Sequence, residues 1–292
     1  NAPTSQIFRA GGVDCFLWTW LSPAEGGASK GLVLLFHGLG AHARFPSVRV
    51  AAEALARGGF TVCAPDFAGH GVSGGQRGFI HSAERLESDA LLFVEAAQRA
   101  HPQLPLFLAG SSMGGAIAFQ AALALGDKGD EVRGLVLLAP MLAPAASAGA
   151  QALVTVLSYT PLSRLPLIPS SATSNERQYA CADVRREVER DAYAYKGKLR
   201  VCSAAALLAL GARCEASLAE LRCAFFCLTA SREQVLGPRS RDAAEQLMRE
   251  AQTPAELRKL KSYDALHGIL CEPEPTRSEI TGEIVEWMLG LA

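Results

Sequence analysis

The sequence predicts an α/β fold with a mostly parallel central sheet, flanked by helices and interrupted once by an inserted helical cap. Short, continuously apolar runs alternate with helical patterns over most of the 292 residues. Strands that are buried on both faces of a parallel sheet have this continuous apolar character. The alternation stops between about residues 140 and 221, where the chain reads as helices and loops separated by prolines.

The expected strands are the apolar runs, and the expected helices are segments whose apolar residues recur every three or four positions. We expect strands at residues 13–21, 31–36, 60–64, 104–109, 133–139, 223–229 and 257–263, and helices at residues 48–57, 83–100, 115–125, 239–251 and 276–289. The chain is therefore divided into an N-terminal part of the core (residues 1–140), a cap or lid (residues 141–221) and a C-terminal part of the core (residues 222–292).

Composition excludes several classes of protein. Hydrophobic residues make up 49% of the chain and charged residues 20%, so a large core is expected. The net charge of −1 gives no basic field for nucleic acid, and no nucleic-acid partner is expected. Eight cysteines without a Cys-x-x-Cys pair indicate free thiols in a reducing compartment, and no Cys/His cluster has the spacing of a metal site.

The sequence also indicates where the protein acts. The first ten residues show no secretory leader, so a cytoplasmic protein is expected. Residues 134–163 carry no charge, but Pro140, Pro144 and Pro161 interrupt them, which argues against a spanning helix. Peripheral contact between the apolar cap and a membrane is left open, as is membrane association.

The most informative motif is Gly110-Ser111-Ser112-Met113-Gly114, which follows an apolar strand and precedes an Ala-rich helix. Strand, tight turn and helix are the context that a Gly-x-Ser-x-Gly nucleophile elbow requires. The glycines leave room for the strained turn, which raises the serine hydroxyl above the sheet edge. Ser112 is therefore the predicted nucleophile.

A serine nucleophile needs a base and a carboxylate that orients the base. His267 is the only one of the six histidines that follows Ser112, and it comes after an expected strand, which suits the base. Glu233 is the carboxylate in the loop after the strand at residues 223–229, and it is the predicted acid. Asp264 and Asp242 are the alternatives.

The oxyanion of the reaction needs two amide donors. The strand at residues 31–36 leads into His37-Gly38-Leu39-Gly40, a loop that can present a backbone N–H. We expect the amides of Leu39 and Met113 to be these donors. His37 precedes the nucleophile on another loop and is expected to brace that loop by hydrogen bonding.

With these residues assembled, the chain resembles the monoacylglycerol lipase and lysophospholipase group of α/β hydrolases over nearly its whole length. The similar segments are His37–Gly40, Asp66–Gly74, Gly110–Gly115, Tyr195–Arg200, and His267–Leu270 with Glu272. The resemblance departs at the acid. Most monoacylglycerol lipases carry Asp there, whereas Glu233-Gln234-Val235 resembles the pattern of bacterial lysophospholipases.

The resemblance and the triad imply hydrolysis of a lipid ester through an acyl-enzyme, with no metal or cofactor. Monoacylglycerol is the favoured substrate, and a lysophospholipid or a smaller ester is the alternative. The apolar cap supplies candidate acyl-chain contacts at Leu153, Leu157, Leu162 and Ile168. Two other interpretations remain open: an aminopeptidase, which would need acidic groups near the substrate amine, and a hydrolase-fold interaction protein without catalysis.

Overall fold

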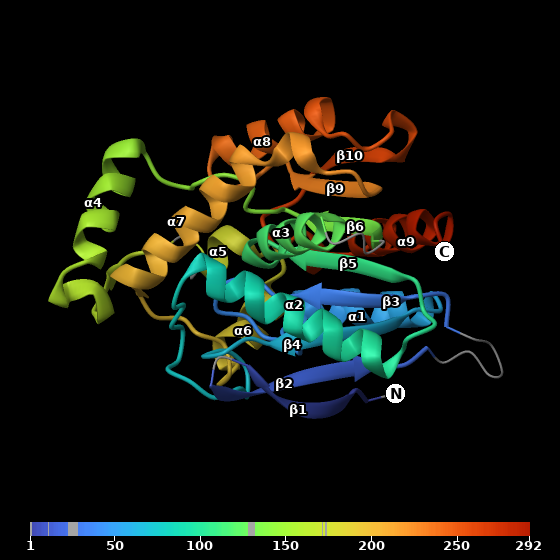
Figure 1. The fold of residues 1–292 in the computed structure, drawn as a ribbon, viewed down its shortest axis with the longest axis horizontal. Helices are drawn as coiled ribbons and strands as arrows, with labels where there is room; N and C mark the ends of the chain where they lie inside the picture. Colours follow the sequence, from blue (N-terminus) through green and yellow to red (C-terminus); the bar gives the residue numbers. More distant parts are fainter. Residues whose placement is uncertain (1, 11, 23–28, 128–131, 171, 173) are drawn as a thin grey trace.

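A computed structural model of the chain describes residues 2–10, 12–22, 29–127, 132–170, 172 and 174–292. Its described residues form a sheet in the order β1-β2-β4-β3-β5-β6-β9-β10 (Figure 1). The strands are β1 (Thr4–Ala10), β2 (Val13–Trp20), β3 (Leu32–Phe36), β4 (Thr61–Asp66), β5 (Leu106–Ser111), β6 (Val132–Leu138), β9 (Phe225–Ala230) and β10 (Arg258–Tyr263). Strands β4, β3, β5, β6, β9 and β10, in this spatial order, are parallel to one another. Strand β2 pairs antiparallel with both β1 and β4. This mostly parallel sheet confirms the predicted fold class.

The expected strands are all present and begin and end within two residues of the predicted positions. The strand that the sequence analysis omitted is β1, whose side chains are mostly exposed. An edge strand of this kind has no continuous apolar run, because only one of its neighbours is a strand and its faces are largely wet. The continuous apolar run that predicted the central strands is therefore missing in β1.

Helices cover both faces of the sheet (Figure 1). They are α1 (Pro46–Arg57), α2 (Ala83–Ala100), α3 (Met113–Asp127), α8 (Pro238–Glu250) and α9 (Thr276–Leu289). Side chains of α2, α3 and α8 join one buried cluster, and side chains of α1 and α9 join the other. Neighbouring residues of β3 point to opposite clusters, with Leu34 in the first and Leu35 in the second, as the period of two in a strand requires.

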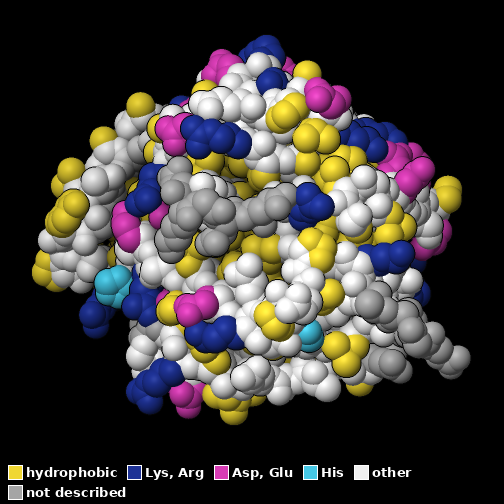
Figure 2. Space-filling view, turned by 45° about the vertical axis from the view of Figure 1, so that its right-hand side comes forward, with side chains coloured by type: hydrophobic (Ala, Val, Ile, Leu, Met, Phe, Trp, Pro, Cys, Tyr) yellow, Lys and Arg dark blue, Asp and Glu magenta, His cyan; other side chains and the backbone are white. Residues whose placement is uncertain are grey.

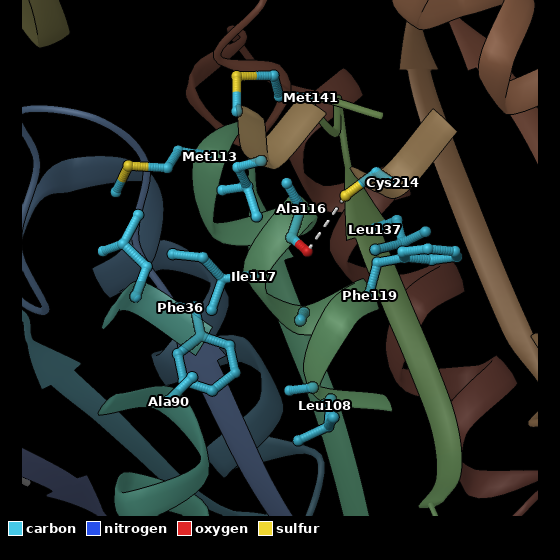
Figure 3. Packing of buried hydrophobic residues seen from close by; sticks show 14 of the residues in the cluster. Phe36, Ala90, Leu108, Met113, Ala116, Ile117, Phe119, Leu137, Met141 and Cys214 are labelled. Atoms are coloured by element: carbon cyan, nitrogen blue, oxygen red, sulfur yellow. Dashed lines mark hydrogen bonds between the residues drawn. The ribbon is translucent and has the colours of Figure 1, made fainter. Parts of the chain in front are cut away.

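Helix α3 is the most deeply packed helix near the centre of the sheet (Figure 3). Ala116, Ile117 and Phe119 of this helix are completely buried, and the Cys214 thiol donates a hydrogen bond to the carbonyl oxygen of Ala116. Met113, at the start of α3, is 1% exposed. The helix is therefore a rigid support for the turn that precedes it.

The segment between β6 and β9 contains the elements expected for a cap. They are α4 (Ala148–Ser158), η1 (Pro161–Arg164), β7 (Pro166–Ile168), α5 (Asn175–Gln178), α6 (Ala182–Arg190), β8 (Leu199–Arg200), α7 (Val201–Ala216) and η3 (Leu218–Glu220). Because β6 and β9 are adjacent parallel strands, this segment leaves the sheet at the carboxyl end of β6 and returns to the amino end of the neighbouring strand β9. Helix α4 projects from the molecule at the left of Figure 1. The domain boundaries at residues 140 and 221 stay a prediction.

One part of the cap is tied to the core near the carboxyl end of β3. His42 Nε2 lies 2.7 Å from Asp191 Oδ2, directly after α6. The backbone N–H of Tyr195 donates to the carbonyl oxygen of Gly40 at 2.8 Å. Within the described part of the chain, no helix is both long enough and apolar enough to cross a membrane.

Candidate active site

Ser112 lies at the junction of β5 and α3, where its backbone has a φ of +56°. This left-handed conformation is unfavourable for a residue with a side chain and persists only where the surroundings hold it. The N–H of Ser112 donates to the carbonyl oxygen of Leu138 at 3.0 Å, and its own carbonyl oxygen accepts from the N–H of Met141 at 3.0 Å. The next strand therefore fixes the turn on both sides of the serine.

Two glycines make this turn sterically feasible. A Cβ atom at Gly110 would overlap the carbonyl oxygen of Gly114, and a Cβ atom at Gly114 would overlap the carbonyl oxygen of Phe36 in β3. These neighbours are backbone atoms, so they cannot rotate away as side chains can. The pattern of glycines follows from the contact among β3, β5 and α3.

The two predicted oxyanion donors border the same cavity as Ser112. Met113 is the first residue of α3, so its N–H has no acceptor within the helix. Leu39 lies in the loop after β3, and the preceding residue, Gly38, packs against the elbow: a Cβ atom there would lie 3.3 Å from the carbonyl oxygen of Ser111. The arrangement is compatible with two amides near the serine, and their role as donors stays a proposal.

His37 is completely buried beneath this loop. Its Nε2 accepts the N–H of Phe67 at 3.2 Å, which leaves Nδ1 to donate to the carbonyl oxygen of Gly38 at 2.8 Å. Burial is the main cause that lowers the pKa of His37, to about 4. The ring is therefore neutral near pH 7 and braces the loop that carries Leu39.

The predicted base and acid are in direct contact. His267 is 3% exposed, and its Nδ1 lies 2.6 Å from Glu233 Oε2. The other carboxylate oxygen of Glu233 accepts the N–H groups of Val235 and Leu236 at 2.6 Å and 3.2 Å. Burial opposes ionisation of Glu233, but the hydrogen bonds from His267 and the two amides outweigh it and hold its pKa below the usual value.

The two alternative acids lie elsewhere. Asp264 has a side chain that is 85% exposed, and it pairs with Arg232 at 2.9 Å. Asp242 is exposed on α8. The geometry thus brings His267 together with Glu233, and the assignment of the catalytic acid to Glu233 stays a proposal.

Two cavities meet at Ser112. A small one of about 40 Å³ includes His267 and polar groups of the cap. A larger one of about 240 Å³ is almost entirely apolar. The small cavity, called the polar cavity below, has both polar residues (Ser47, Ser111, Asn175, Gln178, Tyr179, Tyr195 and Lys196) and apolar ones (Ala41, Phe45, Ala172, Val188 and Ala194) in its wall. The apolar cavity is lined by Met141, Val154, Ile168, Leu199, Leu207, Val235 and Leu236, among others. Ser112 and Leu39 border both cavities.

The four cap residues expected to bind an acyl chain are placed differently from one another. Ile168 lines the apolar cavity, and Leu157 is partly buried against the core. Leu153 and Leu162 are 59% and 41% exposed and do not line either of the two cavities. We therefore retain Ile168 as the proposed contact among these four.

Sequence reasoning missed Val235 and Leu236 as cavity residues. They lie two and three residues after Glu233, and both donate their amides to its carboxylate. An apolar pair this close after the candidate acid was a usable signal, because the acid loop must lie beside the nucleophile. Among the described residues, no group of three or more His, Cys, Asp or Glu side chains could hold a metal ion.

Asp66 and His70, which belong to the Asp66–Gly74 segment, support loops. The Asp66 carboxylate accepts the N–H groups of Ala43 and Val72 at 2.7 Å and 3.0 Å, and the indole N–H of Trp18 at 3.2 Å. Burial lowers the pKa of His70 to about 3, so this ring is neutral as well. Asp66 thus joins three segments near the site, and the His70 ring packs against the His37 ring, with 5.1 Å between the ring centroids.

The parallel sheet, the serine elbow and the His267–Glu233 pair define an α/β hydrolase. A family model described as "Serine aminopeptidase, S33" matches residues 27–274. The chain belongs to this family, and it is a hydrolase of the broad type that includes lipases and esterases.

Comparisons with individual proteins agree with this class and with the resemblance seen in the sequence. The chain is 27% identical over 288 residues to a monoglyceride lipase of Rattus norvegicus, covering 97% of this chain and 89% of the relative. It is 29% identical over 267 residues to the Homo sapiens monoglyceride lipase, covering 90% and 83%. Among solved structures, a soluble variant of Saccharomyces cerevisiae monoglyceride lipase with a substrate analog has a TM-score of 0.83 at 18% identity, covering 99% and 95% of the two chains. That last similarity shows the fold.

The elbow geometry predicts the effect of adding one methyl group. Gly114→Ala should lower the free energy of unfolding by about 2–3 kcal/mol, because the new Cβ overlaps the backbone of β3. Gly126→Ala in the same helix is the matched control. No atom lies within 4 Å of the added Cβ there, so this variant should gain about 0.5–1 kcal/mol. Denaturant titration measures both, and equal stabilities would contradict the steric account.

The neutral state of His37 predicts a pH dependence of stability. Between its folded pKa of about 4 and an unfolded value near 6.5, the unfolded chain binds a proton that the folded chain excludes. The free energy of unfolding should therefore fall as the pH is lowered through this window, by about 1.4 kcal/mol per pH unit for one such proton.

The measurement compares His37→Gln with His81→Gln, an exposed histidine, by urea unfolding at several pH values between 7 and 4. The slope of stability against pH should decrease by about one proton in His37→Gln and stay unchanged in His81→Gln. Identical slopes in the two variants would show that the His37 ring does not resist protonation.

Proposed function

We propose that the protein hydrolyses monoacylglycerols to a fatty acid and glycerol through an acyl-enzyme formed on Ser112. The observation that carries the proposal is the pair of unlike cavities that meet at this serine: a small one whose wall mixes polar and apolar groups beside His267, and a larger one whose wall is mostly apolar. A monoacylglycerol likewise has a polar glycerol on one side of its ester bond and an apolar acyl chain on the other. The names of the curated relatives, all monoglyceride lipases, support the same substrate class.

In the proposed mechanism His267 takes the proton of Ser112 while the hydroxyl oxygen attacks the ester carbonyl. The amides of Leu39 and Met113 hold the negative charge of the tetrahedral intermediate. His267 then protonates the leaving glycerol oxygen and later activates a water molecule that releases the fatty acid. Glu233, which accepts from Nδ1, keeps Nε2 free for these transfers and stabilises the imidazolium.

The apolar cavity supports an acyl chain as its occupant. Each methylene transferred from water to such surroundings contributes about 0.8 kcal/mol. The wall is built from both cap and core, with Ile168 from the cap and Val235 from the acid loop. The loop that carries Glu233, the proposed acid, therefore also forms part of the wall of the cavity proposed for the acyl chain.

The charges around the site favour a neutral alcohol over an amine. Lys196 is the charged side chain among the described residues that line the polar cavity, apart from the catalytic histidine. An aminopeptidase would need carboxylates there for the substrate amine. The cap carboxylates Glu187 and Asp191 are instead engaged with Arg49 and His42.

Replacing the nucleophile tests the reaction. Ser112→Ala should lower the hydrolysis of monoacylglycerol by about a thousandfold or more, with an unchanged circular dichroism spectrum. It should also abolish labelling by a fluorophosphonate probe, whereas Ser88→Ala, at an exposed serine of α2, should behave as the unmodified protein.

A substrate series tests the specificity. Monoacylglycerol should give a higher kcat/KM than lysophosphatidylcholine, short p-nitrophenyl esters or an aminoacyl amide. A preference for lysophosphatidylcholine would replace the proposed substrate with a lysophospholipid. Full activity of Ser112→Ala on every ester would remove the mechanism itself.

We also propose that the outer side of the cap contacts a lipid surface from which the substrate is taken. Hydrophobic side chains gather along the projecting edge that α4 forms (Figures 1 and 2). The exposed ones in this part of the chain are Leu153, Val156, Tyr159, Leu162, Leu165 and Leu167. Exposed apolar groups concentrated on one projection are typical of surfaces that bind a partner or a lipid interface.

The double variant Leu153→Asp/Val156→Asp should bind phosphatidylcholine vesicles about tenfold more weakly, because two apolar anchors become charged. Turnover of emulsified substrate should fall in parallel, and turnover of a soluble short ester should not. Vesicle sedimentation measures the binding. Leu92→Asp, on α2 and 39% exposed, is the control, and equal losses in both variants would contradict a contact specific to the cap.

A further inference from the structure

A buried carboxylate outside the Ser112, His267 and Glu233 group has no role in the mechanism described so far. Glu272 is 4% exposed and follows the short helix η5 (Ile269–Cys271). Its Oε1 accepts the backbone N–H of Leu266 at 2.6 Å, and its Oε2 lies 3.5 Å from Arg232 Nη2. Burying a carboxylate is unfavourable unless it is paired or hydrogen-bonded, so these two contacts account for its presence.

Arg232 reaches the same loop through several atoms. Its Nε lies 2.9 Å from Asp264 Oδ1, and its Nη2 donates to the carbonyl oxygen of Asp264 at 3.2 Å. Its backbone N–H donates to the carbonyl oxygen of Ala265 at 3.1 Å. A planar guanidinium that binds several acceptors at once fixes orientation as well as distance.

The residues that make these contacts are sequence neighbours of the proposed base and acid. Leu266 immediately precedes His267, and Arg232 immediately precedes Glu233. The two loops leave the paired strands β9 and β10, and the last register pair is Tyr263 with Ala230. Beyond that pair, the contacts of Glu272 and Arg232 link the neighbours of the two residues that share the 2.6 Å hydrogen bond.

We propose that Glu272 and Arg232 form a brace that sets the position of His267 relative to Glu233, and that both are positioning residues for the reaction on Ser112. The proposal rests on the function proposed above. Glu272 holds the base loop by the amide before the histidine, and Arg232 holds the acid loop against it. A shift of about 1 Å in such a pair can reduce catalysis about a hundredfold, which is why a device beyond the strands is needed.

The test measures catalysis, nucleophile reactivity and the His267–Glu233 hydrogen bond in Glu272→Ala, Glu272→Gln and Arg232→Gln. In Glu272→Ala, kcat should fall about 10- to 100-fold with KM changed less than about threefold, because only the positioning is lost. Glu272→Gln retains an oxygen acceptor for the Leu266 N–H, so it should recover part of the loss. Arg232→Gln should lower kcat by about tenfold.

The spectroscopic signature separates positioning from loss of folding. In the unmodified protein the His267 Nδ1 proton, held between nitrogen and Glu233, should give a far-downfield proton NMR resonance. In Glu272→Ala this resonance should move upfield or broaden while the unfolding transition stays cooperative. Glu274→Gln is the control, since this exposed carboxylate lies two residues after Glu272 and pairs with Arg277 at 2.7 Å, outside the proposed brace.

The outcomes distinguish this proposal from the proposed function. If the brace does not act, the unmodified protein reacts with a fluorophosphonate at Ser112 and the Glu272 variants react equally fast, with unchanged NMR signals. If the proposed function fails, the unmodified protein is itself unreactive at Ser112. Loss of kcat in Glu274→Gln as large as in Glu272→Ala would also overturn the proposal.

Discussion

The left-handed backbone at Ser112 is the constraint on which the rest of the site depends. It requires β3, β5 and α3 to approach so closely that no side chain fits at Gly110 or Gly114. The buried helix α3 and the hydrogen bonds to the Leu138 and Met141 backbone hold this conformation. The packing of the core thus offsets the backbone strain that holds the serine in position.

The electrostatic arrangement around the serine follows from burial. His37 and His70 are kept neutral because the interior penalises their charged forms. Glu233 is buried as well, yet it remains ionised because His267 and two amides donate to it. The His37 and His70 rings are thereby fixed supports near the Ser112 turn, and His267 is the ring that contacts the Glu233 carboxylate. Burial lowers the pKa of His37 and His70 and keeps them neutral, whereas the donors around Glu233 keep this carboxylate charged beside His267.

The sequence was sufficient for the features that depend on local patterns. Continuous apolar runs located the central strands, and the order of serine, glutamate and histidine selected the three residues, of which the structure joins His267 to Glu233 by a hydrogen bond. It was insufficient where the outcome depends on which side of a helix faces the core. Leu153 and Val154 are adjacent in α4, but one is exposed and the other lines the apolar cavity. The sequence of α4 carries no charged residue that would reveal this difference. The contacts of Glu272 are likewise tertiary and have no signature in sequence.

The attachment of the cap is uneven along its length. The portion around α6 and Tyr195 is fastened to the core by a hydrogen bond between His42 and Asp191 and by a backbone hydrogen bond to Gly40. In α4, by contrast, Val154 is the buried residue. Fluctuations that separate the cap from the core will therefore concentrate at the α4 end, where the fewest interactions must break. The cap is therefore anchored on the α6 side and free to move on the α4 side, where its exposed side chains are hydrophobic.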